Sequence, residues 1–146
     1  MHYDHISFHL SALPVGVAPK HAAHHIGYYF AWAASQNLHS PAAGRLPTFS
    51  MMLQGKISGA TFVLSQLHGG IDPTCFNDLG NRFTQYYYAD EDEGYGHFIA
   101  DYFTALNLES EEAFYRVTDI PLHQNVLNPV FQAAFEQWYT TLAHAR

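Results

Sequence analysis

Apolar side chains recur at helical spacing along most of this chain, and that periodicity constrains the fold more than any other feature. The clearest segment runs from about residue 19 to residue 36, where every third or fourth side chain is apolar. Further helices are expected at about 48–54, 58–67, 72–88, 96–106 and 128–143. Residues 3–10 alternate loosely between polar and apolar side chains, which predicts a short strand. We therefore expect a mainly α, compact helical domain with a short N-terminal strand, with an α+β class as the alternative.

Length and composition predict a single domain over residues 1–146. Hydrophobic residues make up 48% of the chain, which is enough for one sizeable core. No apolar run approaches the roughly 18 residues that a membrane span needs, so no membrane partner is expected. The first residues lack the basic and apolar regions of a secretory signal, and Cys75 is the only cysteine. Both features favour a reducing cytoplasm.

Charge is sparse and unevenly distributed. The chain has 13 Asp and Glu against 6 Lys and Arg, a formal charge of -7. The six basic residues are scattered, whereas binding to phosphate backbones requires clustered Lys and Arg. No nucleic-acid partner is therefore expected. A basic protein partner is compatible with the same charge, although net acidity also serves solubility alone.

The stretch between Phe83 and Tyr115 contains eight acids, six interleaved tyrosines and no Lys or Arg. Tyrosine offers a large rigid contact area, and carboxylates steer a basic partner. Helical spacing places Tyr87 and Tyr102 in the core. The predicted partner-binding residues are Tyr86, Tyr88, Asp90, Glu91, Asp92, Glu93, Tyr95 and Asp101. The alternatives are a solvated acidic loop and a cation site, although the run lacks the order of an EF-hand loop.

The 11 histidines raise the question of metal binding. His21 and His25 are four residues apart, so in a helix they share a face and could hold one ion. His5 and His9 could join them in space. The zincin pattern requires an acid after the first histidine, but position 22 is alanine. We expect no metal and no cofactor, with His21 and His25 as the candidates otherwise.

No pattern of catalytic residues is recognised. The chain has no nucleophile elbow, phosphate-binding glycine loop or dinucleotide fingerprint. Cys75 follows Asp72 and Pro73, a typical helix start, and a helix N-terminus can activate a thiol. A small buried residue at a helix start is the favoured interpretation of Cys75. We expect no enzyme and assign no catalytic residue.

Several short motifs carry a family resemblance. They are Tyr3-Asp4 with Phe8-His9, HHIGYYFAWA at 24–33, ISGATF at 57–62, DLGNRF at 78–83 and Tyr86-Tyr87. In this order they resemble a family of uncharacterised bacterial cytoplasmic domains associated with immunity proteins of polymorphic or contact-dependent toxin systems. The chain departs from that family in its apolar segment 13–19, where members carry a more acidic loop, and in its larger number of histidines.

The resemblance implies inhibition by binding. The chain would be an immunity-type protein that neutralises a basic toxin effector by covering its active site, and nucleases are one class of such effectors. The alternative is a metal-dependent enzyme that uses the histidine-rich N-terminal region. A homo-oligomeric structural protein with an aromatic contact surface is a third interpretation.

Overall fold

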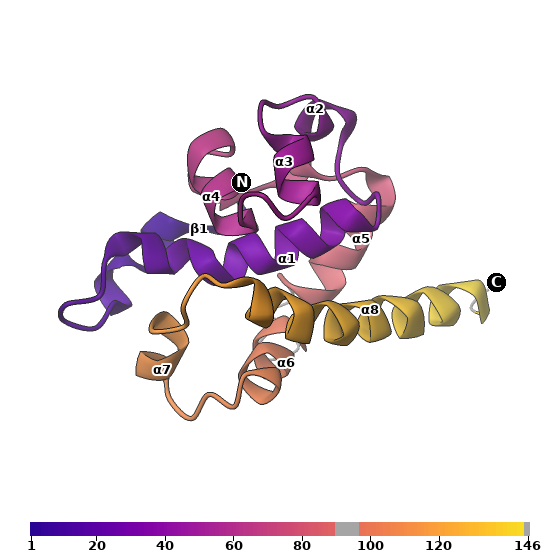
Figure 1. The fold of residues 1–146 in the computed structure, drawn as a ribbon. Coiled ribbons are helices and arrows are strands. Elements are labelled where there is room, and N and C mark those ends of the chain that lie inside the picture. The colour runs from indigo at the N-terminus through magenta and orange to yellow at the C-terminus, as the bar shows by residue number, and fades with distance from the viewer. Residues whose placement is uncertain (90–96, 145–146) are drawn as a thin grey trace.

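The computed structural model describes residues 1–89 and 97–144, and it confirms a mainly α fold (Figure 1). The α-helices are α1 (His24–Ser35), α2 (Pro41–Gly44), α3 (Phe49–Leu53), α4 (Gly59–Gln66), α5 (Asp78–Tyr87), α6 (His97–Ala105), α7 (Glu111–Tyr115) and α8 (Pro121–His144). The strands are β1 (Asp4–His5) and β2 (Gly70–Ile71). The 3-10 helices are η1 (Ile6–Phe8), η2 (Leu10–Ala12), η3 (Pro19–Ala23) and η4 (Pro73–Cys75).

Helix α1 is the centre of the molecule. Ten of its residues are buried, and it runs between α3 and α4 on one side and α6 and α8 on the other (Figure 1). Against α4 the two backbones touch, because a Cβ atom added to Gly27 would collide with the main chain of Ala60. An ordinary helix pair is separated by side chains, so Gly27 and Gly59 permit a closer approach than usual.

The N-terminal strand is much shorter than the expected 3–10. Asp4 pairs with Ile71 and His5 with Gly70 in a two-stranded antiparallel sheet. The strand ends there because the Nδ1 atom of His5 accepts a hydrogen bond from the amide of Ser7 at 3.0 Å. That bond turns the backbone into η1 and then η2, so residues 6–12 leave the extended conformation.

Two helix boundaries also differ from expectation. The helix expected over 72–88 is two elements, because Asp72 caps η4 and Asn77 caps α5, each through a side-chain oxygen. Helix α8 begins at Pro121 rather than at Asn128, and Pro129 lies inside it. A proline inside a helix removes one backbone hydrogen bond. Burial of Leu127 and Phe131 on either side of Pro129 offsets that loss.

Aromatic rings fill the space between α1, α5, α6 and α8. The largest fully buried side chains include Trp32, Tyr29, Phe98 and Phe131. The rings of Phe98 and Phe131 lie 5.5 Å apart, and both pack against Tyr29. Among the described helices, none has the length and apolar character needed to cross a membrane.

Candidate functional site

Two of the predicted partner-binding residues line one hollow on the surface. Tyr86 projects from α5 and Asp101 from α6, and α8 closes the other side of a hollow of about 410 Å³. The lining residues are Tyr86, Tyr87, His97, Asp101, Ala134, Gln137, Trp138 and Thr141. None of these is Lys or Arg. We call this hollow the aromatic groove.

Stacked rings form the wall of the aromatic groove. The ring of Tyr86 lies 5.0 Å from that of His97 and 6.2 Å from that of Trp138, in both cases at an interplanar angle of 26°. Tyr86 remains 41% exposed, whereas Trp138 is 9% exposed. The buried ring of Trp138 therefore supports the ring of Tyr86, and the exposed part of the Tyr86 ring is available to a partner.

The carboxylate of Asp101 is held in place by a buried tyrosine. The hydroxyl of Tyr87 donates a hydrogen bond of 2.6 Å to Oδ2 of Asp101. Burial, together with this carboxylate, raises the pKa of Tyr87, so the hydroxyl keeps its proton. Asp101 thus presents a fixed acidic group at the edge of the aromatic groove.

Tyr88 does not belong to the surface that the sequence predicted. Its hydroxyl points inward and donates a hydrogen bond of 2.6 Å to Oδ2 of Asp4. Its ring packs against Phe98 at 4.3 Å. Tyr87 and Tyr102 are buried, as helical spacing predicted. The other predicted contacts, Asp90, Glu91, Asp92, Glu93 and Tyr95, lie outside the described residues.

Sequence reasoning did not assign His97, Gln137, Trp138 or Thr141 to a binding surface. Trp138 lies within the helix expected over 128–143, and its side chain is buried. Its contribution to the groove depends on how α8 crosses α5 and α6. No pattern within the α8 sequence reveals that crossing.

A second cluster is buried around Asp4. Its Oδ1 atom accepts hydrogen bonds from the amide of His5 at 2.8 Å and from Nε2 of His9 at 2.7 Å. Its Oδ2 atom accepts from Nε2 of His25 at 2.9 Å and from the Tyr88 hydroxyl. Burial alone would raise the pKa of Asp4, but the hydrogen bonds and charges of His25 and His9 outweigh burial and lower it.

His21 is not part of this cluster, although the sequence offered His21 and His25 as the candidate pair for a metal. Its ring lies 4.5 Å from that of His24, because residues 19–23 form a 3-10 helix before α1 begins. Among the described residues, the converging ligand atoms are those of Asp4, His9 and His25. Sequence reasoning named His9 as a side chain that could lie near His21 and His25 in space. Asp4 was missed, because nothing in the sequence marks an acid on a short strand as a ligand.

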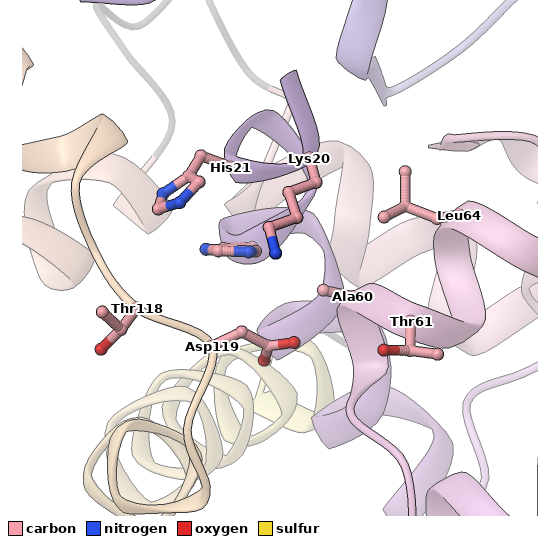
Figure 2. A pocket seen from close by; sticks show the side chains of 8 residues that line it. Lys20, His21, Ala60, Thr61, Leu64, Thr118 and Asp119 are labelled. Carbon is pink, nitrogen blue, oxygen red and sulfur yellow. The ribbon is translucent and has the colours of Figure 1, made fainter. Parts of the chain in front are cut away.

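A third feature is the hollow of about 350 Å³ shown in Figure 2. The amino group of Lys20 and the carboxylate of Asp119 project into the same space. His24 also lines it, with Nδ1 fixed 2.7 Å from the carbonyl oxygen of Val117. Burial lowers the pKa of His24, which favours the neutral ring. Such a hollow suits a small polar ligand, but its side chains form no recognised catalytic set.

The comparisons with known proteins gave one match. A family model described as "Domain of unknown function (DUF7832)" matches residues 2–117. The matched range includes the Asp4 cluster, Tyr86 and Asp101, and it ends before α8. No curated protein matches the chain, and no solved structure does.

Proposed function

The chain belongs to the family described as a domain of unknown function (DUF7832), and from its site we propose an immunity-type protein that neutralises a basic protein toxin by covering the toxin's active site. The observation that carries this proposal is the aromatic groove. It combines an exposed tyrosine on a buried tryptophan with a fixed carboxylate. A nuclease is the class of toxin whose active site is basic, because it binds phosphates.

The aromatic groove has the composition of an interaction hot spot. Tyr and Trp are enriched where interfaces concentrate their binding energy, especially when a rigid neighbour supports the ring. Tyr86 needs little further ordering on binding, because His97 and Trp138 already stack on it. A cationic side chain of the partner beside the exposed part of Tyr86 would be attracted to the carboxylate of Asp101.

The net negative charge of the chain supports a basic partner. The proposal also places the protein in the cytoplasm. The formal charge of -7 accelerates association with a basic surface at low salt. The run Asp90 to Glu93, which joins α5 to α6 in the sequence, adds four acids to this attraction. A lone buried cysteine suits a reducing compartment, where a toxin would be met before it reaches its target.

The test is complex formation with the product of a toxin gene adjacent to the gene of this chain. The two proteins are mixed, and affinity is measured by calorimetry. We expect Tyr86→Ala to weaken binding by about 30-fold or more, as for a hot-spot residue. Replacement of Asp90 to Glu93 by serine should mainly slow association and reduce its salt dependence.

The matched control is Phe8→Ala, which removes a ring that is 60% exposed on η1, away from the aromatic groove. Its affinity should equal that of the unmodified chain. The proposal fails if no complex forms. It also fails if Tyr86→Ala and the serine variant bind and protect cells as well as the unmodified chain.

A metal-dependent enzyme is the second candidate function, favoured by the convergence of Asp4, His9 and His25. Catalysis would require a substrate to reach the metal. The side chain of His25 is 2% exposed and that of Asp4 is 10% exposed, so both are enclosed by protein. The geometry therefore favours a binding role for these residues over a catalytic one.

A further inference from the structure

Asp4, His9 and His25 come from three separate elements and meet at one point. Asp4 lies on β1, His9 follows η1, and His25 lies in the first turn of α1. Each offers one ligand atom, and these atoms all lie within 4.8 Å of one another. The backbone hydrogen bonds of β1 and η1 fix the first two, and the helix fixes the third.

We propose that Asp4, His9 and His25 bind one divalent transition-metal ion, of which zinc is the best fit, and that this ion fastens the N-terminal segment to α1. Two imidazole nitrogens and one carboxylate oxygen form a common donor set for zinc. The site is independent of the proposed toxin binding, because no residue of the aromatic groove contributes to it.

The distances allow an ion with small movements of the side chains. Ligand atoms around a tetrahedral zinc ion lie about 3.3 Å apart, given bonds of about 2.0–2.1 Å. The Nε2 atom of His9 lies 2.7 Å from Asp4 Oδ1, and that of His25 lies 2.9 Å from Asp4 Oδ2. A carboxylate that binds through both oxygens makes room for the ion if each pair separates by a few tenths of an ångström and the two Nε2 atoms, which lie within 4.8 Å, take up the same spacing.

One hydrogen bond of the His9 ring suits both the bound and the free state. In the free state the Nε2–H groups of His9 and His25 donate to Asp4. An ion on Nε2 requires the proton of each ring to move to Nδ1, with no net release of protons. The Tyr115 hydroxyl, 2.7 Å from Nδ1 of His9, can donate to the free ring and accept from the bound ring. Such an outer partner is typical of metal-bound histidine.

Charge gives a reason for an ion to bind. The side chains of Asp4 and His25 are 10% and 2% exposed, so water screens the carboxylate only weakly. The only ion-pair partners of Asp4 among the described residues are histidines. A buried negative charge is costly unless a cation balances it, and a divalent ion would do so. The side chain of His9 is 20% exposed, so the ion and a water ligand can enter from its side.

The experiment uses the full chain purified without a histidine tag and freed of metal by a chelator. Zinc is then added, and zinc content is measured after dialysis. We expect about one zinc per chain, and a rise in Tm of roughly 5–10 °C at a hundredfold excess over Kd. Nitrogen NMR of the His9 ring should show the proton move from Nε2 to Nδ1.

Variants separate this site from the other histidines of the chain. His9→Gln changes a partly exposed residue, so the variant should fold, and it should lose the bound zinc. The control is His68→Asn, which removes an exposed histidine, and asparagine tolerates its backbone φ of 58°. Zinc below about 0.1 per chain would overturn the proposal. So would equal binding by His9→Gln, or a His9 ring that keeps its proton on Nε2 in the presence of zinc.

Discussion

At the scale of single residues, burial decides the chemistry of Cys75. Cys75 is the last residue of the short helix η4 and is 6% exposed. Its sulfur lies 3.8 Å from Oδ1 of Asp72. Burial is the main cause that raises the pKa of Cys75 to about 11, and the charge of Asp72 adds to it. The thiol therefore stays protonated near neutral pH. A long helix beginning at Asp72 would have lowered the pKa instead, but α5 begins only at Asp78.

We predict that the native chain reacts with a disulfide reagent at pH 8 on the order of 100-fold more slowly than the unfolded chain. Two causes combine, since the thiolate is scarce and the sulfur is covered. The measurement compares absorbance time courses with and without urea, and Cys75→Ser gives the background. Equal rates in the two states would show that the thiol is exposed and ionised.

Three consecutive tyrosines show what sequence can predict about single residues. Helical spacing correctly predicted that Tyr87 is buried and that Tyr86 is exposed. It was wrong for Tyr88, which keeps helical φ and ψ angles and lies four residues after the buried Thr84, on the same face. Its hydroxyl instead meets Asp4, which is distant in sequence. Helical spacing gives the direction of a side chain, whereas the segment that packs over it depends on the tertiary fold.

At the scale of elements, the contact between α1 and α4 depends on two glycines. A Cβ atom at Gly27 would meet the main-chain atoms of Ala60, and one at Gly59 would meet the carbonyl group of Gly27. Main-chain atoms cannot rotate away as a side-chain end can. The helices must separate to admit even a methyl group, which would disturb the packing of Phe30 against Phe62.

We predict that Gly27→Ala lowers the free energy of unfolding by about 3 kcal/mol, measured by urea denaturation. Alanine favours a helix over glycine by about 1 kcal/mol, so the steric cost must exceed that gain. The control is Gly16→Ala, where no atom lies within 4 Å and only the positive φ is unfavourable. Gly16→Ala should cost about 1 kcal/mol. An increase in stability for Gly27→Ala would contradict the close packing of α1 and α4.

The sequence predicted which segments form helices better than it predicted the residues at which those helices begin and end. The apolar periodicity located α1, α3, α4 and α6 because each contributes apolar side chains to a continuous core. The division between η4 and α5 depends on Phe76, whose extended backbone forms a bridge with His39. The start of α8 at Pro121 precedes the expected signal at Asn128. Such choices depend on contacts between distant segments, which local sequence does not reveal.

At the scale of the whole molecule, both candidate sites are assembled from distant segments. The aromatic groove combines α5 and α6 with α8, and the Asp4 cluster combines β1 with α1 and Tyr88. The sequence located individual members, such as Tyr86, Asp101 and His25. It could not supply their partners Trp138 and Asp4, because these are brought near only by the packing of the whole chain. The tertiary fold, rather than any one motif, therefore creates each site.

Helix α8 contributes both to the core and to the aromatic groove, although it lies beyond the residues that the family model matches. Its Phe131 is fully buried and packs against four aromatic side chains of other helices: Tyr29, Trp32, Tyr87 and Phe98. Without α8 these rings would face solvent. The folded domain therefore requires α8, and the groove residue Trp138 is positioned by the same packing.

We predict that Phe131→Ala lowers the free energy of unfolding by about 3–5 kcal/mol, because it removes a ring from the centre of the core and leaves a cavity. The matched control on the same helix is Tyr139→Ala, which removes a ring that is 51% exposed and should change stability by only about 0.5 kcal/mol. Both are measured by urea denaturation followed by tryptophan fluorescence. A cost for Phe131→Ala no larger than that of Tyr139→Ala would mean that α8 is not part of the folded core. The aromatic groove would then lose its third wall, and the binding surface would have to lie on α5 and α6 alone.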